Sequence, residues 1–157
     1  MTIHAAPAPR TPQGDAVAHE LARLLADTYT LAIKTQGYHW NVIGPNFHSL
    51  HLLFETHYVE LTAAIDVIAE RIRALGSFAP GSSRAMARLA SIEEEEGAPE
   101  ASEMIGRLIE AHETVIRTAR AALQAGEAAF DVTSVDLATE RIAVHEKTLW
   151  MLRATAA

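Results

Sequence analysis

Four long stretches of the chain place apolar residues at the i, i+3, i+4 and i+7 spacing of an amphipathic helix. They predict helices over residues 15–40, 47–75, 101–124 and 133–153. A shorter helix is expected from Ser82 or Ser83 to about Leu89, after the Pro80-Gly81 turn. Four long helices with one long central connection are typical of a four-helix bundle with a short crossover helix. The predicted fold class is therefore all-α.

Start and stop signals support these boundaries. Asn46 follows the Gly44-Pro45 turn and can cap the second helix, which Gly76 ends. Ser102 is the expected cap of the third long helix. The predicted core face of the first helix is Leu21, Leu24, Leu25, Thr28, Leu31 and Thr35. The predicted core face of the third long helix is Met104, Ile105, Leu108, Ile109, His112, Val115, Ile116, Ala119 and Leu123.

The second helix carries two stripes. With His51 set at zero and 100° advanced per residue, an ordinary core face spans roughly 80°. It contains Phe47, Leu50, Phe54, Leu61, Ile65, Ile68, Ile72 and Leu75. Beside it, an arc of about 100° holds His51, Glu55, Asp66 and Glu70. Two i, i+4 pairs of metal-ligand side chains therefore share one side of one helix.

The spacing of the two pairs limits how they can bind a metal. Glu55 and Asp66 lie eleven residues apart, which is about 16 Å along a helix. Because metal–ligand bonds are only about 2.0–2.6 Å long, one ion cannot be held by both pairs of one chain. The pairs form either two independent sites or half-sites completed by an antiparallel second copy. Small side chains between them, such as Thr62 and Ala63, favour the intersubunit site.

Two runs of the sequence resemble a known family. The run HWNVIGPNFHSLHLLFETHYVEL, followed by DVIAERIRALG, is similar to the signature of the Dps mini-ferritins, the starvation-induced DNA-protecting members of the ferritin superfamily. The run DLATERIAVHEKTLWMLRA resembles the last helix of that family. The resemblance covers nearly the whole chain from about Asp15. It implies a ferritin-like bundle that assembles into a twelve-subunit hollow shell.

The resemblance also implies an activity. Family members oxidise Fe(II), usually with hydrogen peroxide, and store the Fe(III) product inside the shell. The implied ferroxidase ligands are His39, Asp66 and Glu70 from one subunit with His51 and Glu55 from its two-fold mate. The family more often has Asp where this chain has Glu55, so the carboxylate here extends one methylene further.

His39 and Trp40 close the first long helix, and each has an ordinary interpretation. A single histidine in a last helical turn usually stabilises the helix end. A tryptophan there is commonly a buried anchor with a bonded indole N–H. The resemblance implies that His39 is a ligand and that Trp40 is an aromatic beside the iron site, able to absorb stray oxidising equivalents.

Other polar residues have simpler predicted roles. The run Glu93 to Glu96 is expected to be a solvated loop, with iron collection as the alternative. His112 is expected to be a hydrogen-bonded core histidine. Arg141 and His145 are expected at the surface, and Trp150 at a subunit contact or the end of the bundle.

Composition narrows the class of protein. The 157 residues form one domain with 49% apolar and 21% charged residues, as in a soluble globular protein. No cysteine is present, which excludes disulfides and thiolate metal sites. No apolar run approaches the ~20 residues of a membrane span, and the start of the chain lacks a secretory signal. The expected location is the cytoplasm, and residues 1–13 are expected to be a flexible arm before a bundle domain of residues 14–157.

The charge distribution argues against direct DNA binding. The formal net charge is −7 per chain, and the first twenty residues contain one basic residue, Arg10. A net-negative shell repels DNA phosphates unless basic residues gather on an arm or patch. A nucleoid-compacting DNA-binding protein is therefore an alternative that the charges disfavour.

The ligand types indicate iron. A di-iron site inside one bundle would need Glu-x-x-His pairs, and the chain has none. Mixed imidazole and carboxylate ligands suit iron better than calcium or magnesium. Zinc would bind the same ligands without turning over, and should inhibit.

An entry path for iron is expected near the last helix. Glu127, Asp131 and Asp136 cluster at its start, where family members line three-fold pores with acids. A ring of these acids would concentrate cations, although three acids at a helix N-terminus are also ordinary. The remaining alternative for the whole protein is a catalytically silent helical scaffold whose polar stripe is only a dimer seam.

Overall fold

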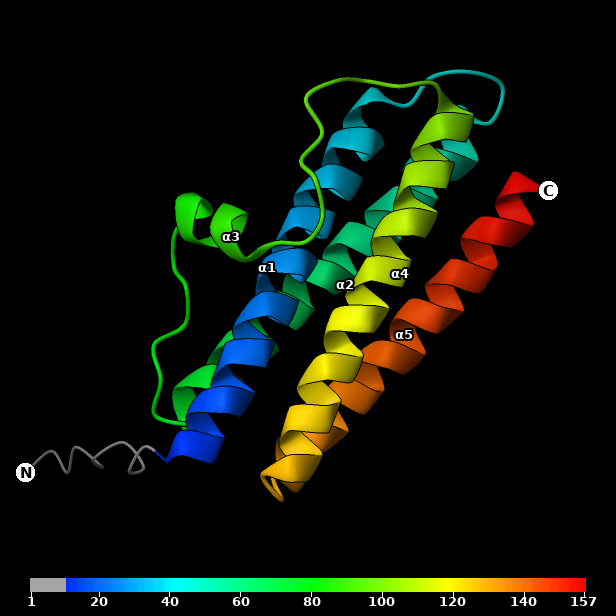
Figure 1. Cartoon of the computed structure of the whole chain (residues 1–157). Helices are drawn as coiled ribbons and strands as arrows, with labels where there is room; N and C mark the ends of the chain where they lie inside the picture. Colours follow the sequence, from blue (N-terminus) through cyan, green and yellow to red (C-terminus); the bar gives the residue numbers. More distant parts are fainter. Residues whose placement is uncertain (1–10) are drawn as a thin grey trace, which may run out of the picture.

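The computed structural model describes residues 11–157, and they fold into five helices. These are α1 (Pro12–Asn41), α2 (Phe47–Ala74), α3 (Ser83–Leu89), α4 (Ala101–Ala128) and α5 (Val132–Ala156). The four long helices lie side by side, with α1 against α2 and α4 against α5, while α3 sits outside them on the long crossover (Figure 1). The predicted all-α four-helix bundle with a crossover helix is confirmed. None of the described helices is long and apolar enough to span a membrane.

The first helix begins earlier than expected. The Thr11 hydroxyl accepts a hydrogen bond from the Gly14 N–H at 3.0 Å, and Pro12 occupies the first helical position. Residues 11–13 therefore belong to the start of α1 rather than to a flexible arm. The rest of the expected arm, residues 1–10, lies outside the described residues.

The remaining helix ends combine confirmed and corrected predictions. Ser82 caps α3 through the Ala85 N–H, and Gly76 follows α2 with a positive φ of 85°. The predicted Ser102 cap is wrong, because α4 begins at Ala101 and Glu100 occupies the cap position. The helix α4 also continues through Gly126, which packs against Val135 of α5.

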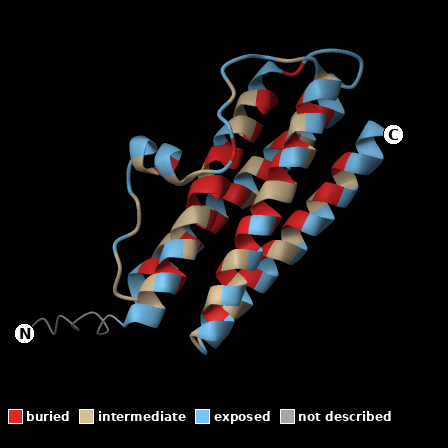
Figure 2. Ribbon diagram, viewed as in Figure 1, coloured by how far each residue is buried: buried red, intermediate tan, exposed pale blue. Residues whose placement is uncertain are grey.

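The predicted core faces are mostly correct. All six predicted core residues of α1 are fully buried. On α2, five of the eight are buried, namely Leu50, Phe54, Leu61, Ile68 and Ile72. Ile65 and Leu75 are partly buried against the core, whereas Phe47, at the first turn of α2, has 42% of its surface exposed. Figure 2 shows the buried residues on the sides of the helices that face the bundle interior.

Two predictions for α5 are wrong. Arg141 and His145, expected at the surface, are 6% and 0% exposed. His112 of α4 is buried as expected, and its Nδ1 lies 2.8 Å from Nδ1 of His145. The side of α5 that faces the bundle is therefore partly polar, which apolar periodicity does not detect.

A buried carboxylate attaches the crossover to the bundle. Asp27 of α1 is fully buried, and its Oδ1 accepts from the backbone N–H groups of Ser91 at 2.5 Å and Ile92 at 3.2 Å. Its Oδ2 accepts from the Thr118 hydroxyl of α4 at 2.6 Å. One side chain thus joins α1, the crossover and α4. Charged carboxylates are rarely buried without such partners, because an unpaired one would be costly.

Replacing Asp27 should weaken the fold substantially. The change Asp27→Ala leaves two backbone donors and one hydroxyl without their acceptor, which should cost about 3 kcal/mol of unfolding free energy. The midpoint of thermal unfolding should fall by roughly 6–12 °C for a chain of this size. The exposed Glu140→Ala is the matched control. Equal midpoints for the two variants would show that Asp27 does not hold the crossover.

Candidate metal centre

The hairpin between α1 and α2 brings His39 and His51 together. Their rings are stacked, with centroids 3.8 Å apart and an angle of 19° between planes. His39 stands in the last turn of α1, and His51 stands in the second turn of α2. The short loop that joins the two helices folds them antiparallel, so these positions meet although twelve residues separate them.

The two histidines lock one another in place. Nδ1 of His39 lies 2.8 Å from the backbone oxygen of His51, and Nδ1 of His51 lies 2.8 Å from the backbone oxygen of His39. A carbonyl oxygen only accepts, so each Nδ1 carries the proton and donates. Each Nε2 therefore keeps a lone pair. This is the arrangement in which an imidazole is oriented by its second nitrogen to bind a metal with its first.

The structure corrects the expected grouping of the ligands. His39 was expected to act with Asp66 and Glu70 of its own subunit, but its ring stacks on His51. Asp66 lies fifteen residues beyond His51 on α2, about 22 Å along the helix axis. In one chain the candidate ligands therefore fall into two separate groups, called half-sites below: His39, His51 and Glu55 in one, and Asp66 and Glu70 in the other. The antiparallel hairpin, which sequence spacing does not reveal, is the reason.

Neither half-site is complete. Among residues 11–157 of one chain, no group of three or more histidine, aspartate or glutamate side chains is placed to hold a metal ion. Glu55, Asp66 and Glu70 are all exposed. The outward side of α2 also exposes Leu52, Val59 and Val67, with 46%, 56% and 55% of their surfaces accessible. Exposed apolar side chains therefore lie along α2 next to each half-site and between them.

Aromatic rings surround the histidine pair. The Tyr58 ring meets His39 edge-on with centroids 5.2 Å apart, and the Phe47 ring lies 5.2 Å from His51. Sequence reasoning passed over Tyr58, although its place seven residues after His51 puts it on the same side of α2. The interpretation of Trp40 as a buried anchor is wrong for the single chain, in which 67% of its surface is exposed.

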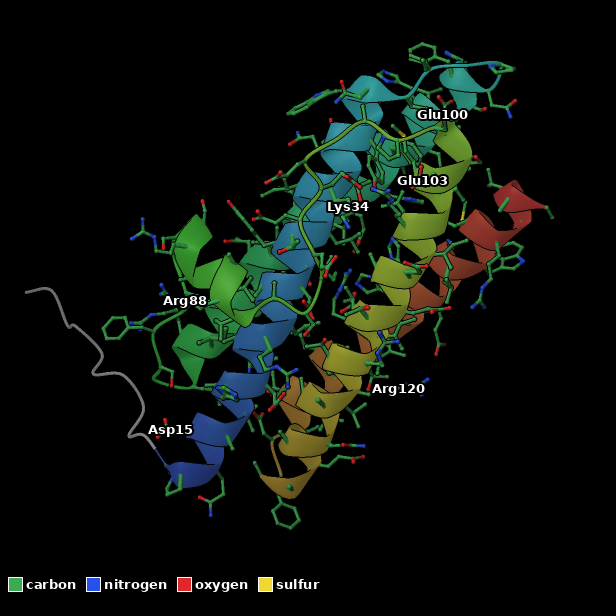
Figure 3. The ribbon with its side chains drawn as sticks, turned by 45° about the horizontal axis from the view of Figure 1, so that its top comes forward. Asp15, Lys34, Arg88, Glu100, Glu103 and Arg120 are labelled. Atoms are coloured by element: carbon green, nitrogen blue, oxygen red, sulfur yellow. The ribbon has the colours of Figure 1, made fainter. Side chains whose placement is uncertain are left out.

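The acidic run of the crossover is not uniformly solvated. Glu95 accepts from the Tyr38 hydroxyl at 2.7 Å and is also bonded by Arg107. These two hydrogen bonds lower the pKa of Glu95 to about 2, while burial raises the pKa of the Tyr38 hydroxyl. Lys34 projects from α1 beside this segment (Figure 3), and burial lowers the pKa of its ammonium. Glu95 is therefore a structural residue of the crossover, whereas Glu93, Glu94 and Glu96 are exposed.

One of the three expected pore acids has a structural partner. Asp131 caps α5, accepting from the Ser134 N–H at 3.2 Å and from the Arg71 guanidinium of α2 at 2.7 Å. Burial acts to raise the pKa of Asp131, but the bonds from Arg71 and Ser134 outweigh it and leave the pKa lowered. Glu127 and Asp136 are exposed near the same end of the bundle.

Comparison with known proteins identifies the family. The family described as Ferritin-like domain matches residues 18–157. An uncharacterized low temperature-induced protein of Nostoc sp. is 42% identical over 143 residues, which cover 90% of this chain and 80% of that protein. A DNA protection during starvation protein of Brevibacillus brevis is 34% identical over 138 residues, 88% of this chain and 93% of that protein.

Solved structures agree with this assignment. The crystal structure of a Dps protein from Bacillus brevis superposes with a TM-score of 0.91 at 32% identity, covering 95% of this chain and all of that one. A Dps protein of Vibrio cholerae O1 reaches a TM-score of 0.91 at 28% identity, covering 99% of this chain and all of that one. The fold is thus a ferritin-like four-helix bundle, and the chain belongs to the Dps family of the ferritin-like superfamily.

Proposed function

We propose that this protein is an iron-oxidising and iron-storing mini-ferritin with ferroxidase sites between subunits. The observation that carries the proposal is the His39–His51 pair, whose Nδ1 atoms are bonded to backbone and whose Nε2 atoms are left as ligands. Iron is the substrate: it reaches the site as Fe(II) and is stored inside the shell as Fe(III). The Vibrio cholerae relative is described as a ferritin-like diiron-carboxylate protein, which fits this chemistry.

A two-fold contact between α2 helices would complete each site. If two copies of α2 pack antiparallel, His39, His51 and Glu55 of one copy face Asp66 and Glu70 of the other, and the symmetry makes two identical sites. The exposed Leu52, Val59 and Val67 would be buried by the same contact, which supplies a hydrophobic driving force. Twelve such subunits in a closed shell would provide the storage cavity.

The ligand set suits iron oxidation by peroxide. Two imidazole nitrogens and up to three carboxylates hold Fe(II), and the anionic oxygens favour the harder Fe(III) product. Hydrogen peroxide accepts two electrons, one from each of two ferrous ions, and is reduced to two hydroxide ions. Consuming Fe(II) and peroxide together would protect DNA in the cytoplasm from oxidative damage under stress, without direct DNA binding.

Glu127 and Asp136 remain the candidates for an acidic iron-entry pore. Both are exposed near the α4–α5 turn, and rings of them around a three-fold axis would attract cations. Asp131 serves this pore indirectly in our proposal, since its bonds to Arg71 and Ser134 hold the turn in place. Trp40 and Tyr58 are the proposed aromatic neighbours of the oxidation site.

Removing either histidine of the pair should abolish fast oxidation. His39→Ala and His51→Ala each delete one ligand and unlock the other ring, so the initial rate with peroxide should fall at least about tenfold. Stopped-flow absorbance of the ferric product measures this rate. His48→Ala, an exposed histidine on the same helix, is the control and should keep the wild-type rate. A wild-type rate in His51→Ala would show that the histidine pair is not the oxidation site, and no fast oxidation in the wild type would support a silent scaffold.

Mixing two inactive variants should restore part of the activity. When His51→Ala and Asp66→Ala subunits are refolded together, half of the random two-fold pairs are mixed, and one of the two sites in each mixed pair is intact. Recovery should therefore reach about a quarter of the wild-type rate. The variants refolded separately are the controls. No recovery in an assembled mixture would place the complete site within one chain.

Zinc should act as a competitive inhibitor. Zn²⁺ prefers the same imidazole and carboxylate ligands and cannot be oxidised, so prior loading should suppress iron oxidation. Titration calorimetry should show zinc binding to the wild-type shell and its loss from the His51→Ala/Asp66→Ala double variant. Unchanged zinc binding by that variant would locate the metal elsewhere.

A further inference from the structure

A second histidine pair lies inside the bundle, away from the proposed iron site. His112 of α4 and His145 of α5 are 2% and 0% exposed, and their Nδ1 atoms are 2.8 Å apart. Nη2 of Arg141, which is itself 6% exposed, lies 3.2 Å from Nε2 of His145. Helices α4 and α5 run side by side (Figure 1), and this pair forms a polar contact between them.

The guanidinium of Arg141 determines where the protons are. An arginine only donates, so Nε2 of His145 must accept and its Nδ1 must carry the hydrogen. That hydrogen is donated to Nδ1 of His112, whose own hydrogen is then on Nε2, an atom with no partner. Each histidine is therefore neutral, and each basic nitrogen already accepts a hydrogen bond.

We propose that the His112–His145 pair is an acid-sensitive switch that holds α5 against α4 only while both rings are neutral. An added proton has two places to go, Nδ1 of His112 or Nε2 of His145. The first would put two hydrogens face to face in the contact between α4 and α5. The second would do the same in the contact between His145 and Arg141. Protonation therefore breaks one of the two hydrogen bonds that fix the pair.

The surrounding charges make protonation more costly. The Glu60 carboxylate of α2 pairs with both Nη atoms of Arg141, so its negative charge is balanced by that guanidinium. The His57 ring, also from α2, lies 6.1 Å from the His112 ring. From α5, Arg141 places a positive charge directly on His145. The buried carboxylate of α1, Asp27, is bonded to Thr118 and the crossover. Burial, together with His57 and Arg141, lowers the pKa of His112 to about 3, and burial also lowers the pKa of His145.

The lowered pKa values of His112 and His145 set the pH range of the switch. An unfolded histidine takes up a proton below about pH 6.5, whereas the folded pair resists it. Stability from the pair is therefore complete above pH 6.5 and is lost as the pH falls below that value. Glu95 acts at lower pH, since its pKa of about 2 in the fold means that its contribution is complete above its ordinary value of 4.5 and is lost only below it. Between pH 6.5 and 5 the buried histidines are the sensitive groups, namely the pair in the α4–α5 contact and His57 of α2, whose pKa burial also lowers.

Hydrogen–deuterium exchange on the assembled protein tests this switch. Each of the two histidines takes up a proton when α5 opens. Each therefore raises the equilibrium constant for opening by up to tenfold, and the two together by up to a hundredfold, for each pH unit below 6.5. After correction for intrinsic exchange rates, α5 peptides of the wild type should open about a hundredfold more at pH 5.5 than at pH 7.5. His112→Leu/His145→Leu should remove most of this increase and leave only the part due to His57. His19→Gln/His48→Gln, which removes two exposed histidines, should retain it.

A conservative variant keeps the test decisive if the double variant does not assemble. His145→Gln still offers Arg141 an acceptor but cannot take up a proton, so the pH effect should shrink by about tenfold. An identical pH response in the wild type, His145→Gln and the leucine variant would overturn the proposal. So would a wild-type α5 that is equally protected at both pH values.

Discussion

The rise of an α-helix is the constraint on which the proposed chemistry depends. At 1.5 Å per residue, the separation of eleven positions between Glu55 and Asp66 becomes about 16 Å, and no side chain of α2 can shorten that distance. The ligands of one chain are consequently divided into a histidine-rich half and a carboxylate half. In our proposal this division makes oxidation depend on assembly, because only a second α2 can bring the missing half within reach of an iron ion.

The two histidines of the first half-site are already fixed in one orientation within a single chain. Reciprocal hydrogen bonds between the two rings and the two backbones fix both tautomers, and the stacked rings cannot turn independently. The carboxylate side has no comparable support, since Asp66 and Glu70 are exposed. In our proposal the rigid half therefore sets the geometry, and the mobile carboxylates adjust to the charge of the iron as it changes.

Polar groups also organise the interior of the bundle. Asp27 joins the crossover to α1 and α4, and Arg141 of α5 bonds Glu60 of α2 while it orients His145 of its own helix. Such groups contribute little net stability when satisfied, but leaving one without its partner is expensive. They therefore specify which helices pack together more than they strengthen the packing. In our proposal the His112–His145 pair makes the contact between α4 and α5 depend on pH.

Much of this protein followed from its sequence alone. Apolar periodicity and turn residues predicted five helices, their order and most of their buried faces, because these depend on local spacing. The i, i+4 pairs on α2 likewise determined how far apart the candidate metal ligands lie, while their role as ligands stays a prediction. Tertiary structure alone decided that His39 belongs with His51, since a hairpin brings together residues that no local period relates. It also decided that Arg141 and His145 are buried, because a charged residue can enter a core when helices distant in sequence supply its hydrogen-bond partners.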